Sequence, residues 1–307
     1  MLYGTVVVHG GGAMARMRDL AAPAAAALCL GAFGTFSLAA VGAGCWVAAA
    51  SGAPAAVWAR NLGAWLAGAV LAIALARLST RRAVLPFIAV ALASLVATLA
   101  LPGLSGVHRW VAIGPMRLNC AETFLPLALV SWAWPGQASR LRWLAPAGLA
   151  AVLALQPDAS QAAALAAGVV ALALASPMSW RSRLIVAAAP ILAAVVAVAR
   201  PDPLQPVPEV EGILRLAAAL SPTVAVIAVL LLAGAATAPL AAVVATPRAR
   251  PAALALCAYF AVAALATAVG AFPVPLVGMG VSPILGAWFG VGLLASLVRR
   301  ASVSPEA

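Results

Sequence analysis

Residues 181–200 read RSRLIVAAAPILAAVVAVAR, with no charged side chain between Arg183 and Arg200. A helix needs about 20 mostly apolar residues to cross the hydrocarbon core of a bilayer, and this run approaches that length. Similar runs, bounded by Arg, Pro or Gly, recur along the whole chain. They predict membrane spans at residues 22–48, 62–78, 83–102, 122–135, 143–156, 161–177, 184–199, 214–236, 251–271 and 283–298.

The composition indicates the same class of protein. Hydrophobic residues make up 65% of the 307 residues and charged residues 8%, whereas soluble domains average about 45–50% and about 25%. We therefore predict an all-α, polytopic integral membrane protein with about ten transmembrane helices. Residues 22–300 form the membrane domain, 1–21 a cytoplasmic leader and 301–307 a cytoplasmic tail. A translation start at Met14 or Met17 would shorten the leader.

The distribution of arginine predicts the orientation. All 18 basic residues are arginine, and most fall in alternate loops or near the chain ends, as the positive-inside rule requires of the cytoplasmic side. Both termini are therefore expected to be cytoplasmic. The arginines assigned to this side are Arg16, Arg18, Arg77, Arg81, Arg82, Arg140, Arg142, Arg181, Arg183, Arg248, Arg250, Arg299 and Arg300.

Two classes of function are disfavoured. The net charge of +11 does not indicate a nucleic-acid partner, because the arginines form short groups between apolar runs rather than one basic face. No metal-ligand spacing occurs among the two histidines and the four cysteines, so we predict no dedicated metal site. The cysteines are expected to be small buried side chains: Cys29, Cys45, Cys120 and Cys257.

The opposite, outer face carries most of the acidic residues. A charge at the bilayer centre costs several kcal/mol, so ionisable residues retained at the mouths of helices indicate a polar site. Three outer segments hold them, at 106–124, 155–161 and 200–215, and the first also holds Arg109 and Arg117. The carboxylates concerned are Glu122, Asp158, Asp202, Glu209 and Glu211.

Each of these residues also has a purely structural interpretation. Glu122 could cap a helix and pair with Arg109 or Arg117, since acidic residues favour helix N-termini. Asp158 is a natural cap after Pro157. Trp110 could be an interfacial anchor. In the same way, Glu209 and Glu211 could be solvated loop charges, and His108 an exposed loop residue.

The order of residues in the outer segments resembles the SEDS family (shape, elongation, division and sporulation; the RodA/FtsW type). Residues 106–114, GVHRWVAIG, match G-x-x-R-W-x-x-x-G, and Glu122 stands at the family's glutamate that opens span four. Residues 156–158, QPD, match the start of Q-P-D-x-G. Residues 56–68, AVWARNLGAWLAG, and the end of the chain from Phe272 resemble the family's second span and final region.

The chain departs from the family pattern at three places. Leu125 stands where a lysine is usual, and the final Gly-Gly-Ser-Ser is missing. The family's catalytic aspartate lies in a motif like L-P-E-A-H-T-D-F, for which this chain has VPEVEGIL at 207–214. Pro208 and Glu209 match, but the aspartate has no equivalent; Glu211 is the first substitute for it and Asp202 the second.

The resemblance implies a peptidoglycan glycosyltransferase that polymerises lipid II at the outer face of the bacterial cytoplasmic membrane, in division, elongation or shape control. It implies Glu211 or Asp202 as general base, and a substrate site of Arg109, Trp110, Arg117, Glu122, Asp158 and Glu209. It also implies a class B penicillin-binding protein (a transpeptidase) as partner. No cofactor is required, although a divalent cation between carboxylate and pyrophosphate is compatible with this chemistry.

Two alternatives remain open. The missing aspartate, lysine and Gly-Gly-Ser-Ser are compatible with a catalytically degenerate family member that serves as a scaffold or regulator of wall synthesis. A ten-span transporter of small molecules is the third hypothesis, for which five-plus-five inverted symmetry would be expected.

Overall fold

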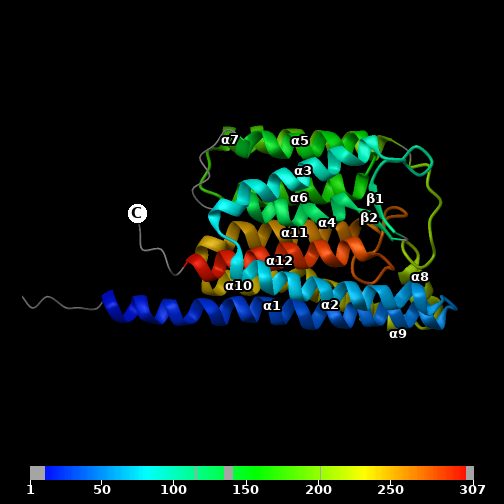
Figure 1. Ribbon diagram of the computed structural model, residues 1–307, viewed down its shortest axis with the longest axis horizontal. Helices are drawn as coiled ribbons and strands as arrows, with labels where there is room; N and C mark the ends of the chain where they lie inside the picture. The colour runs from blue at the N-terminus through cyan, green and yellow to red at the C-terminus, as the bar shows by residue number, and fades with distance from the viewer. Residues whose placement is uncertain (1–10, 115, 135–140, 201, 302–307) are drawn as a thin grey trace, which may run out of the picture.

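The computed structural model describes residues 11–114, 116–134, 141–200 and 202–301. The first ten residues of the predicted leader, and the tail from 302, lie outside the described residues. The elements, shown in Figure 1, are α1 (Gly11–Ala50), α2 (Ala55–Leu78), η1 (Arg81–Ala83), α3 (Val84–Ala100), β1 (Trp110–Ile113), β2 (Met116–Asn119), α4 (Cys120–Ala133), α5 (Leu141–Leu155), α6 (Ala159–Ala175), α7 (Trp180–Ala199), α8 (Ile213–Leu220), α9 (Pro222–Thr237), η2 (Ala238–Leu240), α10 (Ala241–Ala245), η3 (Pro247–Ala249), α11 (Arg250–Ala266) and α12 (Val281–Ala301).

The prediction of an all-α membrane fold is confirmed. Within the described residues, seven helical segments are long and apolar enough to cross a membrane, and three shorter apolar helices, α4, α5 and α6, fall at predicted spans. Large apolar side chains stay exposed along several helices, for example Leu66 on α2, Leu184 on α7 and Leu230 on α9. Such exposure suits helices that face lipid, where every backbone polar group must be paired within the segment.

One predicted span is wrong in its first part. The run 214–236 is not a single helix, because α8 ends at Leu220 and α9 begins at Pro222. Ser221 between them is extended, with φ −167° and ψ 130°. Proline cannot donate a backbone hydrogen bond and excludes the preceding residue from the helical conformation. The segment therefore consists of a short helix followed by the span itself.

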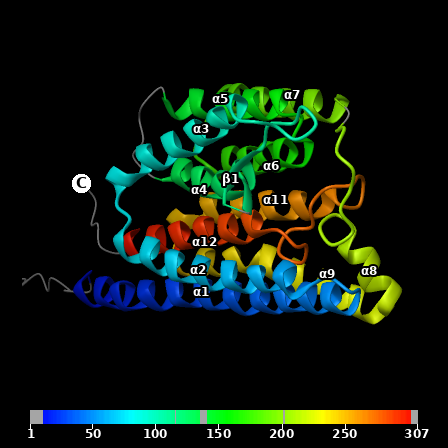
Figure 2. The ribbon, with the colours of Figure 1, turned by 45° about the vertical axis from the view of Figure 1, so that its right-hand side comes forward.

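Helix α12 is the centre of the bundle. It packs against α1, α2 and α4, and 78% of its most apolar stretch is buried inside the protein, compared with 22% for the segment that contains α3. Trp288 on α12 makes edge-to-face contacts with Phe33 and Trp65, at ring-centroid distances of 4.8 and 5.5 Å. Figure 2 shows α12 lying between α2 and α11, so the last span of the chain holds the earlier ones together.

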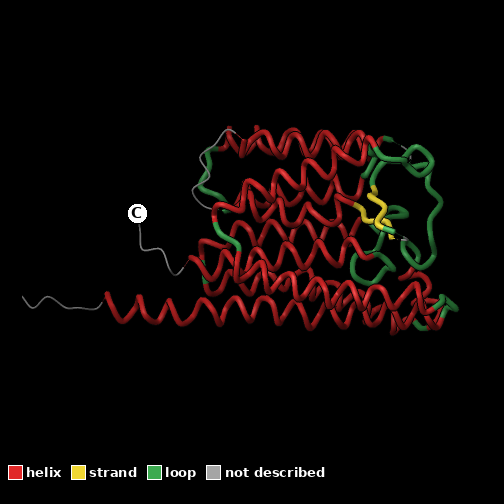
Figure 3. The backbone as a smooth tube through the Cα atoms, in the orientation of Figure 1, coloured by secondary structure: helices red, strands yellow, loops and turns green. Residues whose placement is uncertain are grey.

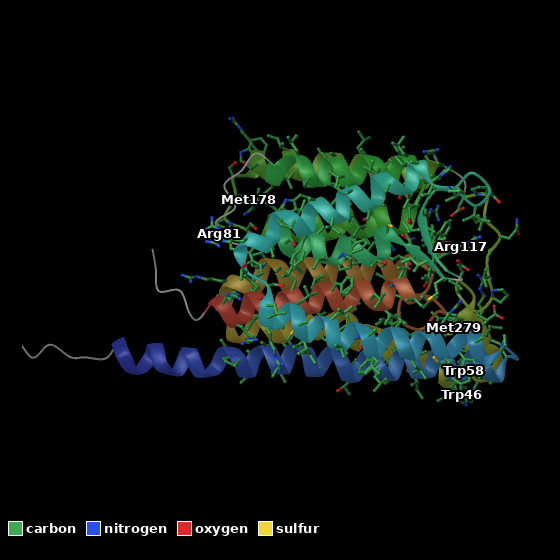
Figure 4. The ribbon with its side chains drawn as sticks, viewed as in Figure 1. Trp46, Trp58, Arg81, Arg117, Met178 and Met279 are labelled. Atoms are coloured by element: carbon green, nitrogen blue, oxygen red, sulfur yellow. The ribbon has the colours of Figure 1, made fainter. Side chains whose placement is uncertain are left out.

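The two ends of the bundle differ. Trp46, Trp58, Arg117 and Met279 lie at one end, and Arg81 and Met178 at the other (Figure 4). The antiparallel pair β1–β2 and the longest loops gather at the first end, which we call the cavity end (Figure 3). Arg81 of the arginine-rich side and Arg117 of the acidic side thus lie at opposite ends of the bundle, as the sequence predicted.

Close helix packing depends on Gly286 of α12. A Cβ added there would lie 1.9 Å from the backbone oxygen of Glu122 on α4. We expect Gly286→Ala to force α12 and α4 apart and to lower the free energy of unfolding by about 1–3 kcal/mol, the usual cost of overpacking. Equilibrium unfolding of the purified protein in detergent by sodium dodecyl sulfate measures this loss.

Gly63 on α2 is the matched control, because an added Cβ meets nothing within 4 Å. Gly63→Ala should leave the stability unchanged or raise it slightly, since alanine is the better helix former. Equal stability of the two variants would contradict the close α4–α12 contact.

Candidate functional site

A cavity of about 550 Å³ opens at the cavity end of the bundle. Its walls come from α2, the β1–β2 pair, the starts of α4, α6 and α12, and the loops 202–211 and 271–280. The charged side chains that line it are Arg60, Arg109, Arg117, Glu122, Asp158, Asp202 and Glu211. Segments far apart in the sequence thus supply one polar cavity at the end of an apolar bundle.

Asn119 fixes the wall between β2 and α4. Its side-chain oxygen accepts hydrogen bonds from the backbone N–H groups of Ala121 (2.9 Å) and Glu122 (3.3 Å), so it caps α4. Its own backbone N–H donates to Ser282 Oγ at 2.8 Å, which ties β2 to the start of α12. Asparagine is among the best N-cap residues, and here the cap also determines the position of Glu122.

Arg109 makes the densest set of polar contacts in the site. The residue is 7% exposed, and its guanidinium donates to the backbone oxygens of Gln156 and Pro157. Arg109 Nη2 lies 2.8 Å from Asp202 Oδ2, and Nε lies 3.8 Å from Asp158 Oδ2. One buried cation therefore joins β1 to the α5–α6 turn and to the loop that follows α7.

Gln156 and Asp158 of the QPD segment support the same wall. Gln156 donates to Thr98 Oγ1 (2.6 Å) and to the backbone oxygen of Leu95 (3.1 Å) on α3. Asp158 is the N-cap of α6, accepting at 3.4 Å from the N–H of Gln161. The structural interpretation of Asp158 as a cap thus holds, while its carboxylate also lines the cavity.

Glu211 lies in a turn before α8 and lines the cavity. Its Oε2 accepts the backbone N–H of Val207 at 2.7 Å. The turn rests on the loop before α12, because the N–H of Val274 donates to Val210 O (3.2 Å) and that of Met279 to Glu209 O (2.9 Å). Gly278 permits this approach, since an added Cβ would lie 2.7 Å from Val210 O.

The surroundings of Glu211 change its acidity. Burial raises the pKa of the Glu211 carboxyl above its ordinary value of 4.5, because desolvation penalises the charged form. Hydrogen bonds from the backbone N–H groups of Val207 and Glu211 itself oppose this increase, and the negative charge of Asp202 adds to it. A carboxyl with a raised pKa is a stronger base once it is ionised.

Glu122 also lines this cavity. It is 8% exposed, in the first turn of α4. It also lines a second, smaller cavity of about 30 Å³ that is walled mainly by apolar side chains of α9, α11 and α12. Gln161 and Tyr259 line this second cavity too, and the Tyr259 hydroxyl donates to Gln161 Oε1. Glu122 thus lies where the polar cavity meets the apolar interior.

The structure brings together all the candidate site residues except one. Trp110 lines the cavity and lies 5.9 Å from the guanidinium carbon of Arg109. The side chain of Glu209 is not among those that line the cavity, whereas its backbone oxygen holds Met279. His108 is not among the residues that line the cavity, and its Nδ1 forms a hydrogen bond with Leu101 O at 2.8 Å.

Sequence reasoning missed three residues of the site, Arg60, Asn61 and Ser282. Arg60 and Ser282 line the cavity, and Asn61 Nδ2 donates to Gly278 O at 2.9 Å. The signal for the first two was the match of residues 56–68 to the family's second span. Ser282 lies in the stretch from Phe272 that resembles the family's final region, but nothing in that resemblance marked this serine itself.

The described residues contain no group of three or more His, Cys, Asp or Glu side chains placed to hold a metal ion. Two carboxylates of the cavity, Asp158 and Asp202, share Arg109 as their counter-charge.

Fold and site together define a polytopic helical membrane protein with a polar cavity at one end of its bundle. Comparison with solved structures identifies the fold. The rod shape-determining protein RodA of Thermus thermophilus matches with a TM-score of 0.64 and 21% identity, over 88% of this chain and 96% of RodA. A mutant of the same RodA matches with a TM-score of 0.66 and 22% identity, over 88% of this chain and 97% of that one.

A third solved structure, described as the structural coordination of polymerization and crosslinking by a peptidoglycan synthase complex, matches with a TM-score of 0.63 and 22% identity, over 88% and 97% of the two chains. Comparison of the sequence with protein-family models and with curated proteins finds no significant match. The chain has the RodA fold, and the prediction of a SEDS-type fold is confirmed.

Arg109 provides a test of how the site is held. We expect Arg109→Gln to lower the free energy of unfolding by about 3–5 kcal/mol, because removing one partner of a buried ion pair leaves an uncompensated charge. Asp158, with 4% of its side chain exposed, is the carboxylate left behind. The double variant Arg109→Gln/Asp158→Asn should recover part of the loss in the same detergent unfolding assay.

Arg200 is the matched control. It is exposed and donates to the backbone oxygens of Ala154 and Leu155, close to the turn that Arg109 holds. Arg200→Gln should cost less than about 1 kcal/mol, as is usual for surface substitutions. A similar loss for the two variants would remove the distinction between Arg109 and an ordinary surface arginine.

Proposed function

We propose that this protein is a peptidoglycan glycosyltransferase that polymerises lipid II at the outer face of the bacterial cytoplasmic membrane. One observation carries the proposal: the candidate site residues of three separate outer segments line a single cavity in a chain with the RodA fold. The similar structures are a rod shape-determining protein and a peptidoglycan synthase complex, and this similarity supports the same function.

The reaction joins two lipid-linked sugars. The 4-hydroxyl oxygen of the acceptor attacks the anomeric carbon of the donor, a new C–O bond forms, and the bond from that carbon to the pyrophosphate oxygen breaks. The lipid pyrophosphate leaves with the electron pair of the broken bond, and the hydroxyl proton passes to a carboxylate. Cations near the leaving group stabilise its charge.

Glu211 is the better candidate for the general base. Asp202 Oδ2 forms an ion pair with Arg109 Nη2 at 2.8 Å, so this carboxylate is already engaged by a cation of the site. The backbone N–H of Val207 donates to Oε2 of Glu211, so the other carboxylate oxygen, Oε1, is the one proposed to accept the proton. The raised pKa of Glu211 favours this proton acceptance. Asp202, in this arrangement, positions Arg109.

Replacing Glu211 by glutamine tests this assignment. Glu211→Gln should lower the rate of lipid II polymerisation by about 10²–10⁴-fold, the contribution typical of a general base. The assay follows glycan-chain length on gels with purified protein and labelled lipid II. Glu209→Gln is the matched control two residues away, because the Glu209 side chain does not line the cavity, and its rate should stay close to that of the wild type.

The pH profile provides a second test. Glu211 must be ionised to accept a proton, so the rate should fall as the pH drops through a pKa above 4.5. The folded protein binds this proton more tightly than the unfolded chain, so stability should fall as the pH rises from 4.5 through the raised pKa. Unfolding and rate measurements across this range compare wild type with Glu211→Gln, in which both effects should disappear.

A class B penicillin-binding protein is the proposed partner, because polymerised chains must be cross-linked. The support is the described link of polymerization with crosslinking in the similar synthase complex. A cation between carboxylate and pyrophosphate remains compatible with the cavity.

A second candidate function is a non-catalytic scaffold or regulator of wall synthesis. The observation that favours it is Leu125, which replaces the family's lysine and is fully buried in the core on α4. Under this alternative, Glu211→Gln would fully complement a deletion strain, and lipid II polymerisation would be absent from the wild-type protein and its partner complex.

A further inference from the structure

Positive charge gathers at the end of the bundle opposite the cavity end, where Arg81 lies (Figure 4). The last turn of α2, the turn η1 and the last turn of α12 supply arginines there, and all of these except Arg299 are exposed. They are Arg77, Arg81, Arg82, Arg299 and Arg300. The acidic side chains that the structure describes line the cavity or belong to the loop 202–211 beside it, so none of them neutralises this group.

Hydrogen bonds fasten the end of α12 to the end of α2. Arg299 Nη1 donates to the backbone oxygen of Ala76 at 3.2 Å. Arg300 Nε donates to the backbone oxygen of Ser79 at 2.6 Å, and Ser296 Oγ donates to the same oxygen at 3.1 Å. The last carbonyl groups of a helix have no partner within the helix, and arginine side chains are well suited to them. The backbone of α2 thus fixes the position of Arg300 without neutralising its charge.

Arg82 and Arg300 flank the same turn. Consecutive Cα atoms are about 3.8 Å apart, so Arg82 lies within about 11 Å of Ser79, to which Arg300 is bonded. The turn is closed by the N–H of Ala83, which donates to Thr80 O at 2.9 Å. In the described part of the chain, Arg82 has no hydrogen bond or ion pair, and neither do the two terminal amino groups of Arg300.

We propose that Arg82 and Arg300, with the turn 79–82 between them, bind the phosphate group of an anionic phospholipid. We call this the turn site. A guanidinium is planar and always charged, and it binds phosphate oxygens through parallel N–H groups. The turn site lies at the other end of the bundle from the polar cavity, so this inference goes beyond the proposed function and does not depend on it.

The surroundings of the turn site favour a lipid over a soluble anion. Leu78, the last residue of α2, is 76% exposed, and Leu85, in the first turn of α3, is 46% exposed. A phospholipid can place its phosphate at the arginines and its acyl chains along such apolar side chains. The sequence predicts that this end is cytoplasmic, and basic groups on that side of transmembrane helices are known to bind anionic headgroups. The lipid would then join the ends of α2 and α12 from outside.

Titration of the purified full chain in mild detergent with phosphatidylglycerol, followed by native mass spectrometry, tests the turn site. The wild type should bind one lipid saturably, and phosphatidylcholine should not displace it. Arg82→Gln and Arg300→Gln should each raise the Kd about five- to tenfold, the effect of losing one arginine near an anionic headgroup. Arg82→Gln breaks no hydrogen bond within the described residues, so it separates lipid binding from folding.

Arg181 is the matched control, because it is an exposed arginine in the first turn of α7. Figures 1 and 2 both show α7 and α2 on opposite sides of the bundle. Arg181→Gln removes the same charge and should keep the wild-type Kd. An equal rise in Kd for the variants of Arg82, Arg300 and Arg181 would assign the binding to diffuse surface charge and overturn the inference.

Competition experiments test the class of ligand. Inorganic phosphate and polyglutamate should displace phosphatidylglycerol only in large excess, because neither covers the leucines beside the turn. Displacement by inorganic phosphate at an equal concentration would assign the turn site to a soluble anion. Displacement by polyglutamate at an equal concentration would assign it to an acidic protein. Either result would overturn the proposal of a lipid.

Discussion

A buried guanidinium must find compensating charge and hydrogen-bond acceptors, because the low-dielectric interior penalises an unpaired cation. Arg109 meets this constraint with two carboxylates and two backbone oxygens, drawn from the α5–α6 turn and the loop after α7. The contacts of this one cation thus fix the relative positions of β1, α6 and the loop after α7, and so shape the cavity that they enclose. The carboxylates of the site are arranged around this arginine, which leaves Glu211 apart from the ion pairs.

Much of the fold could be predicted from the sequence because a membrane allows few solutions. Apolar length, together with the internal pairing of backbone groups in lipid, leaves only the helix for these runs. The break at Ser221–Pro222 shows where this reasoning fails. Both halves of the run are apolar, so their hydropathy predicted one continuous span. The helices α8 and α9 are separate because Pro222 disfavours a helical conformation of the residue before it. The packing around Gly286 could not be predicted either, because it depends on which helices become neighbours.

Most residues of the candidate site could be predicted from the sequence, but the role of each residue could not. Polar groups retained at helix mouths pointed to Glu122, Asp158 and Arg109, since each costs free energy there. The sequence could not tell which charges neutralise one another, because that depends on contacts such as the 2.8 Å pair between Arg109 and Asp202. Ser282 gave no signal, since one serine among apolar residues is ordinary until its hydroxyl meets the N–H of Asn119.

The short length of α4 affects how deep in the membrane the cavity lies. Its 14 residues extend about 21 Å, whereas the hydrocarbon core of a bilayer is about 30 Å thick. Protein surrounds α4 on nearly every side, so lipid cannot close over the difference. At the cavity end, α4 begins deeper in the bundle than the adjoining ends of α1 and α2 (Figure 1), and Glu122 lies in its first turn. A water-filled recess inside the membrane thickness would let the head of a lipid-anchored molecule descend to the carboxylates while its hydrocarbon chain remains in the bilayer.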